Sequence, residues 1–100
     1  MKANGEFGMD PQELEQHLRD LIAPDRLPSY IESARYELGT DHIGEPAVRI
    51  YFAITPETDV ILSKDKAKLK AYSEFKQDLS RRILNLESGC FPFIRLVEAA

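Results

Sequence analysis

The chain has 100 residues, of which 43% are hydrophobic and 30% are charged, and its formal net charge at pH 7 is −4. These values predict one soluble domain with a modest core. The acidic balance disfavours bulk attraction to nucleic acid or an anionic membrane, and no apolar run approaches the roughly 20 residues that a membrane-spanning helix needs. The one cysteine, Cys90, cannot form an internal disulfide and is typical of a cytoplasmic protein.

Residues 1–8 show no hydrophobic periodicity and contain two glycines before a second methionine, Met9. We interpret them as an expression scar, with a natural flexible arm as the alternative, and expect the folded domain to span residues 9–100. Asp10 and Pro11 then form a typical helix start. The apolar residues that follow are spaced as on one face of a helix, and they predict a helix over residues 11–23: Leu14, Leu18, Leu21 and Ile22.

Two strands are expected next, over residues 29–38 and 47–55. The first is an imperfect alternation in which Tyr36 and Leu38 share the more apolar side. The second alternates strictly, which is the period of a strand and not of a helix; its apolar side carries Val48, Ile50, Phe52 and Ile54. The connecting residues 39–46 are rich in turn formers, and extending both strands into them would shorten the true turn.

The second half of the chain is predicted to hold a long helix and a third strand. Residues 55–59 break the second strand, and the short apolar run 60–62 is interpreted as a connection lying on the core. A helix over residues 65–87 is indicated by apolar positions three or four apart: Leu69, Tyr72, Phe75, Leu79, Ile83 and Leu86. Gly89 suits a left-handed stop after it, and a strand follows over residues 92–97.

The expected fold class is α+β, a single small domain of α-β-β-α-β order with a three-stranded sheet and two helices on one face. The first two strands form an antiparallel hairpin, and a right-handed crossover makes the third parallel to the second. We favour the strand order 2-1-3. The order 1-2-3, which places the most apolar strand at the centre, is the alternative.

If the apolar sides of the strands face the helices, their other sides form an open sheet surface. The residues expected on it are arginines and aromatics: Arg35, Arg49, Tyr51, Phe93 and Arg95. Such residues are enriched in protein interfaces, so we expect a protein-interaction or accessory domain. Aromatics among arginines also bind single-stranded nucleic acid, which is the alternative partner, although the net charge disfavours it.

No set of residues predicts an enzyme, a cofactor or a metal. Asp41, His42 and Glu45 are competent ligands in one loop, but a zinc site usually needs more ligands at defined spacing, so we expect a solvated loop. A nucleophilic Cys90 would need a base such as His42, and nothing in the sequence places the two together. A small acidic domain without chemistry of its own could also be the inhibitor or antitoxin half of an operon-encoded pair.

Self-association as a homodimer is a further expectation, based on the favoured strand order. In the order 2-1-3 the strand 47–55 lies at the sheet edge, where its outer amides and carbonyls lack partners and only Pro46 and Arg49 protect it. Two such edges can pair about a two-fold axis into a sheet of six strands. In the order 1-2-3 this strand is central, and the corresponding expectation is a monomer.

Overall fold

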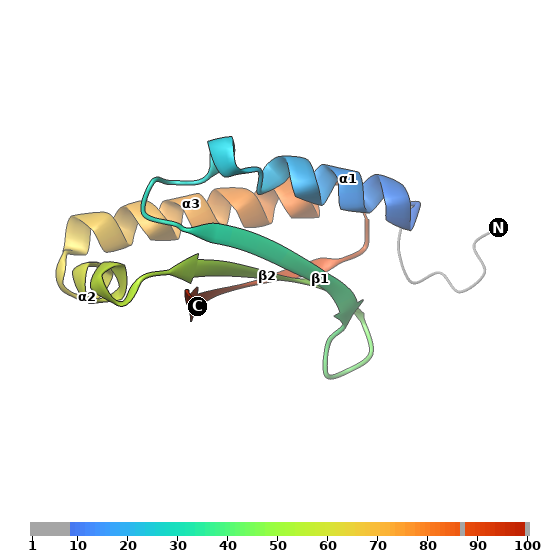
Figure 1. Ribbon diagram of the computed structural model, residues 1–100. Helices are drawn as coiled ribbons and strands as arrows, with labels where there is room; N and C mark the ends of the chain where they lie inside the picture. Colours follow the sequence, from blue (N-terminus) through green and yellow to red (C-terminus); the bar gives the residue numbers. More distant parts are fainter. Residues whose placement is uncertain (1–8, 87, 100) are drawn as a thin grey trace.

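The computed structural model describes residues 9–86 and 88–99, so the segment 1–8 lies outside the described residues. The elements follow one another as α1 (Pro11–Leu21), a short 3₁₀ helix η1 (Pro24–Arg26), β1 (Ser33–Thr40), β2 (Pro46–Ile54), α2 (Pro56–Lys64), α3 (Lys66–Leu84) and β3 (Phe91–Glu98). Figure 1 shows α1 and α3 side by side over one face of the sheet. The expected α+β class, with these helices on one face, is confirmed.

The favoured strand order is wrong, because the sheet has the order β1-β2-β3. β1 pairs antiparallel with β2, and β3 pairs parallel with β2 on its other side. The central position suits β2 because this strand is the most apolar of the three. In this position the backbone amides and carbonyls along both of its edges can form hydrogen bonds with the neighbouring strands. The edge strands are therefore β1 and β3, and β2 offers no free edge to a second copy.

The inner face of β2 forms the floor of the core, as its alternation predicts. Val48, Ile50 and Phe52 are 0% exposed and Ile54 is 3% exposed. They pack against residues from α1, α2 and α3 in one hydrophobic cluster, of which the buried helical members are Leu14, Leu18, Leu62, Tyr72, Leu79 and Ile83. Burial raises the pKa of the Tyr72 hydroxyl to about 12. This shift fits a well-desolvated core.

Local capping explains where the helices begin. Asp10 Oδ1 accepts a hydrogen bond from the Gln12 amide at 3.3 Å, as the helix start at Pro11 requires. The segment 55–64 differs from expectation: Thr55 Oγ1 accepts from the Thr58 amide at 3.2 Å, and Pro56 occupies the first turn of α2. The Thr55-Pro56 pair ends the second strand, as the sequence predicts, but it is equally a typical helix start.

The long helix is shorter than expected and separate from α2. Asp65 Oδ1 accepts hydrogen bonds from the amides of Ala67 and Lys68 at 3.0 and 3.2 Å, and so caps α3. Leu69, expected in the buried stripe, is 45% exposed because the first turns of α3 extend past the end of the sheet (Figure 1). The helix ends at Leu84, and Gly89, with a φ of 80°, turns the chain into β3 instead of ending α3.

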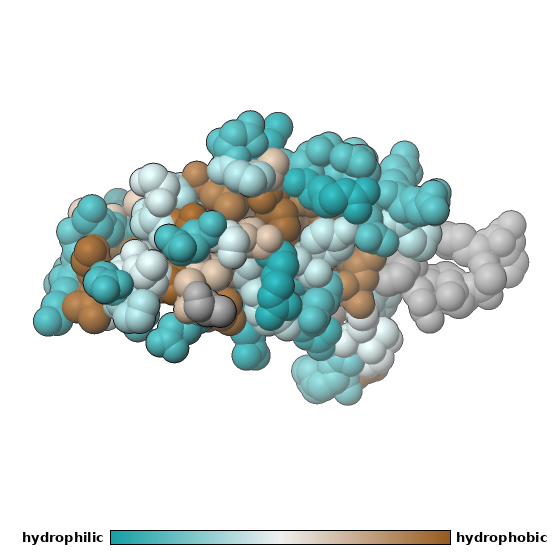
Figure 2. All heavy atoms as spheres, viewed as in Figure 1, coloured by the Kyte–Doolittle hydropathy of each residue, from teal (hydrophilic) through white to brown (hydrophobic). Residues whose placement is uncertain are grey.

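The end of the molecule around α2 carries exposed apolar side chains. Figure 2 shows brown surface there, where Val60 is 50% and Ile61 is 46% exposed. Within the described residues, no helix is both long and apolar enough to cross a membrane.

Candidate interaction surface on the open sheet face

The sheet register collects the predicted surface residues into two rows across the three strands. Arg35, Tyr51 and Arg95 are Cα partners in one row, and Glu37, Arg49 and Phe93 are partners in the next. Because side chains alternate between faces, these odd-numbered positions lie on the side opposite the core. All five predicted surface residues therefore share the open face, and the strand order 1-2-3 places Arg49 and Tyr51 at its centre.

A stacked pair occupies the β1 side of this face. The Arg35 guanidinium lies 4.1 Å from the ring centroid of Tyr51, a cation–π geometry. Glu37 holds both partners: its Oε2 lies 3.5 Å from Arg35 Nη1, and its Oε1 accepts the Tyr51 hydroxyl at 3.3 Å. All of these groups are accessible to water, so the contacts stabilise the fold little; they fix the orientation of Arg35 and Tyr51 instead.

The β3 side of the face holds a cavity of about 330 Å³. Asp41 and His42 of the hairpin loop form part of its wall, and two arginines and two aromatic residues line the rest: Arg49, Arg95, Tyr51 and Phe93. In Figure 1 the hairpin tip bends away from the helices, toward the open face. Arg49 Nη2 donates to the Thr40 carbonyl at 2.9 Å. The Arg95 side chain forms no hydrogen bond or ion pair with another described residue. Its charge is therefore available to a ligand.

The hairpin loop is held together by hydrogen bonds to Asp41. Asp41 Oδ1 accepts hydrogen bonds from the amides of Glu45 and Ile43 at 2.9 and 3.0 Å, and these bonds hold the pKa of its carboxyl below the ordinary value. Gly44 closes the turn with a φ of 86°. No group of three or more potential metal ligands occurs among the residues that the structure describes.

Two phenylalanines add an exposed apolar area along β3. Phe91 is 53% and Phe93 is 37% exposed, and their rings meet edge to face with centroids 5.2 Å apart. Phe91 is not among the surface residues predicted from the sequence, although it has the same parity as Phe93. The period-two spacing from Phe93 back to Phe91 is the signal that would have found it.

The charges on this face are opposite in sign to the charge of the whole chain. The open sides of the strands carry three arginines and one carboxylate, Glu37, and Asp41 adds a second carboxylate in the cavity wall, whereas the chain has a net charge of −4. The acidic residues that outweigh them therefore lie elsewhere, and the face presents local positive charge. Local charge of this kind steers the approach of an acidic partner.

Cys90 and His42, which nothing in the sequence places together, lie in different surroundings in the structure. Cys90 is 3% exposed and belongs to the hydrophobic cluster, where burial raises the pKa of its thiol. His42 lies exposed in the hairpin loop, and among the described residues no hydrogen bond joins it to Cys90. A buried thiol with a raised pKa is a poor nucleophile.

Comparisons of the chain with protein-family models, with curated proteins and with solved structures found no match.

Proposed function

We propose that the chain is a non-catalytic interaction module whose open sheet face binds an acidic surface or segment of a partner protein. The observation that carries the proposal is the cluster of Arg35, Arg49 and Arg95 around Tyr51 and Phe93, with Arg95 unpaired among the described residues. Arginine and aromatic side chains dominate the binding energy of protein interfaces. Glu37 and Thr40 already orient two of the arginines, which lowers the entropy cost of binding.

Single-stranded nucleic acid is the second candidate ligand of the same face. The stacking of Arg35 on Tyr51 and the exposed ring of Phe93 favour it, because bases stack on aromatic rings and guanidinium planes. The overall charge of −4 opposes it more than it opposes a short acidic segment, since a nucleic-acid strand carries a negative charge at every phosphate. We therefore place the acidic protein partner first.

The two ligand classes can be separated by direct binding measurements. The probes are a synthetic peptide of alternating glutamate and tyrosine and an oligothymidine strand, titrated into the labelled protein while its backbone amide NMR signals are recorded. We expect the peptide to shift amides of the open face and the hairpin loop. Oligothymidine binding that weakens steeply with salt would favour the second candidate. If neither probe shifts these amides, the proposal is wrong.

A matched pair of variants tests whether the arginines bind the peptide. Arg49→Glu reverses one charge at the centre of the face, and we expect peptide affinity to fall at least about tenfold. Lys70→Glu makes the same charge change at an exposed position of α3, on the helical layer, and should leave the affinity within about twofold. Equal losses in both variants would show that only net charge matters and would contradict a defined site.

We also propose that the chain self-associates as a homodimer. Support comes from exposed apolar side chains at its surface: Val60 and Ile61 at the α2 end, Leu84 at the end of α3, and Phe91 on β3. The rings of Phe91 and Phe93 are in contact, and contiguous exposed apolar surface of this kind often marks an interaction site. Light scattering at micromolar concentration should give twice the chain mass of 11.4 kDa, and a mass of one chain would end this part of the proposal.

A further inference from the structure

The outer edge of β3 carries backbone groups that no described strand pairs. The Ala99 amide donates to the Ile54 carbonyl at 2.8 Å, so odd-numbered residues of this segment direct their backbone groups toward β2. Backbone groups alternate in direction along a strand, so those of Ile94, Leu96 and Glu98 point to the outer edge. Pro92 has no amide hydrogen but offers its carbonyl there. This edge is therefore a template for one more strand.

Two grooves with mixed polar and apolar walls lie along the same edge, one at each end. One groove lies between α3 and the first half of β3, and its walls include Ser80, Leu84 and Ile94. Another lies between the start of α2 and the second half of β3, with Val60 and Leu96 in its walls. Leu84 and Val60 are each 50% exposed. A strand added to β3 would lie between these grooves and cover part of both.

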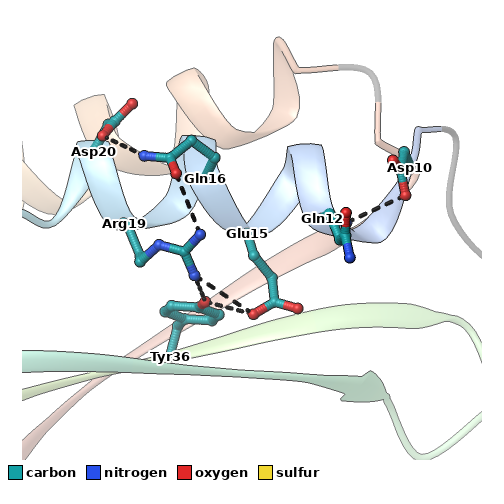
Figure 3. Close-up of polar contacts among 7 residues, drawn as sticks. All are labelled: Asp10, Gln12, Glu15, Gln16, Arg19, Asp20 and Tyr36. Atoms are coloured by element: carbon teal, nitrogen blue, oxygen red, sulfur yellow. Dashed lines mark hydrogen bonds and ion pairs between the residues drawn. The ribbon is translucent and has the colours of Figure 1, made fainter.

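The opposite edge of the sheet is protected by polar groups. On β1 the open side carries Arg35 and Glu37, which already contact each other and Tyr51. On the helical side the Tyr36 hydroxyl donates to Glu15 at 2.8 Å and accepts from Arg19 at 3.3 Å, as Figure 3 shows. Charged side chains are a common way of blunting an edge strand. β3 has Pro92 at its start, Arg95 in its middle and Glu98 at its end, but neither charged side chain forms an ion pair with another described residue.

We propose that two copies of the chain pair through β3, antiparallel, about a two-fold axis that passes at Ile94. This inference rests on the proposed homodimer and adds its surface and register. With the axis at Ile94, Phe93 of one copy lies opposite Arg95 of the second copy, and the reverse pair forms on the other side of the axis. These are positions without direct hydrogen bonds, where Cα atoms approach to about 4.5 Å. Each pair brings a guanidinium to an aromatic ring.

Three other registers are less complementary. An axis at Phe93 limits the overlap of the two β3 strands to residues 91–95, against residues 91–97 for the axis at Ile94, and therefore forms fewer hydrogen bonds between them. An axis at Arg95 sets two guanidinium groups directly opposite each other, and like charges in this position destabilise a sheet. An axis at Leu96 sets Ile94, on the inner face, opposite Glu98 of the second copy. The axis at Ile94 instead sets Phe91 opposite Val97 and allows the amides of Ile94 and Leu96 to donate to the carbonyls of Ile94 and Pro92 of the second copy. Self-complementary side chains select this register.

The assembly would join the two open faces into one surface of six strands. The arginines of both copies would then lie on the same side, because a two-fold axis perpendicular to the sheet preserves which face each side chain occupies. A long acidic segment could contact both halves. The dimer and the acidic partner are thus compatible, but neither requires the other.

Disulfide trapping in the full chain tests the register. The background is Cys90→Ala, which removes the buried native thiol. In this background Ile94→Cys places two thiols at the axis, with Cα atoms about 5.5 Å apart, within the range that a disulfide spans. We expect this variant to form a covalent dimer under mild oxidation. Should Ile94→Cys unfold, as circular dichroism would show, an equimolar mixture of Phe93→Cys and Arg95→Cys should form a mixed covalent dimer, because both positions lie on the exposed face.

Each outcome supports or overturns the inference. Covalent dimers from Ile94→Cys or from the mixture, and none from Arg95→Cys alone, support the register. A covalent dimer from Arg95→Cys alone places the axis at Arg95 and overturns it. A dimeric mass for the unmodified chain without trapping by any of these variants shows that the dimer uses another surface. A monomeric mass would contradict the proposed homodimer. Peptide binding to the open face is measured in a separate experiment, and its result does not depend on the homodimer.

Discussion

The two faces of β2 carry alternate residues of one strand and serve opposite purposes. On the inner face Phe52 and its neighbours are removed from water and hold the helices to the sheet. On the open face Arg49 and Tyr51 remain accessible, and their contacts run to Thr40, Arg35 and Glu37 within the same sheet. Alternate residues of β2 therefore stabilise the fold and form the open surface. A single substitution can change one of these properties without changing the other.

The sharpest test of this separation compares two adjacent residues. Phe52→Ala should lower the free energy of unfolding by about 3–5 kcal/mol, because it removes a buried ring and leaves a cavity. Tyr51→Ala, one position along and on the open face, should cost about 1 kcal/mol. Urea denaturation followed by circular dichroism measures both. Equal losses would contradict the assignment of the core to one face of β2.

A smaller effect on stability is expected for Tyr36, whose hydroxyl lies at the solvent-exposed edge of the inner face. Tyr36→Phe removes the hydroxyl that contacts Glu15 and Arg19 (Figure 3), and the loss of bonds to charged groups should cost about 1 kcal/mol. Tyr51→Phe removes a hydroxyl that donates to the exposed Glu37 and should change stability by less than about 0.5 kcal/mol. The same denaturation experiment applies. If Tyr51→Phe costs more, the polar contacts of the open face matter more for folding than this comparison allows.

The elements that sequence predicted well are those whose signal is local. Period-two alternation in β2 and the Asp10-Pro11 start of α1 depend on neighbours in the chain, and the structure confirms both. Strand order depends on which edges pair over long distances, which no local pattern records, and here the favoured order was wrong. The sequence did not predict α2 for another reason. The Thr55-Pro56 pair suits both a strand end and a helix cap, and the tertiary packing of Leu62 favours the helix.

The candidate surface was predictable in its membership but not in its geometry. Parity alone assigns Arg49 and Tyr51 to the open face once their neighbours are assigned to the core. The stacking of Arg35 on Tyr51 requires the register between β1 and β2, and the contribution of His42 to the cavity requires the bend of the hairpin. Both depend on side-chain and loop placement, which composition and spacing do not determine.

The smallest expected effect concerns the loop at the margin of the open face. Hydrogen bonds from the amides of Glu45 and Ile43 lower the pKa of Asp41 from its ordinary 3.8. A carboxyl whose pKa is lower in the folded state stabilises the loop fully above the ordinary value and loses this contribution as the pH falls through the lowered pKa. The amide NMR signals of Ile43 and Glu45 should therefore titrate together with a midpoint below 3.8. Asp41→Asn should abolish this titration, whereas Asp25→Asn, which lies outside the loop, should not. A midpoint at or above the ordinary pKa would show that these two amides do not stabilise the charged carboxylate. The loop would then not hold His42 in a fixed position beside the cavity.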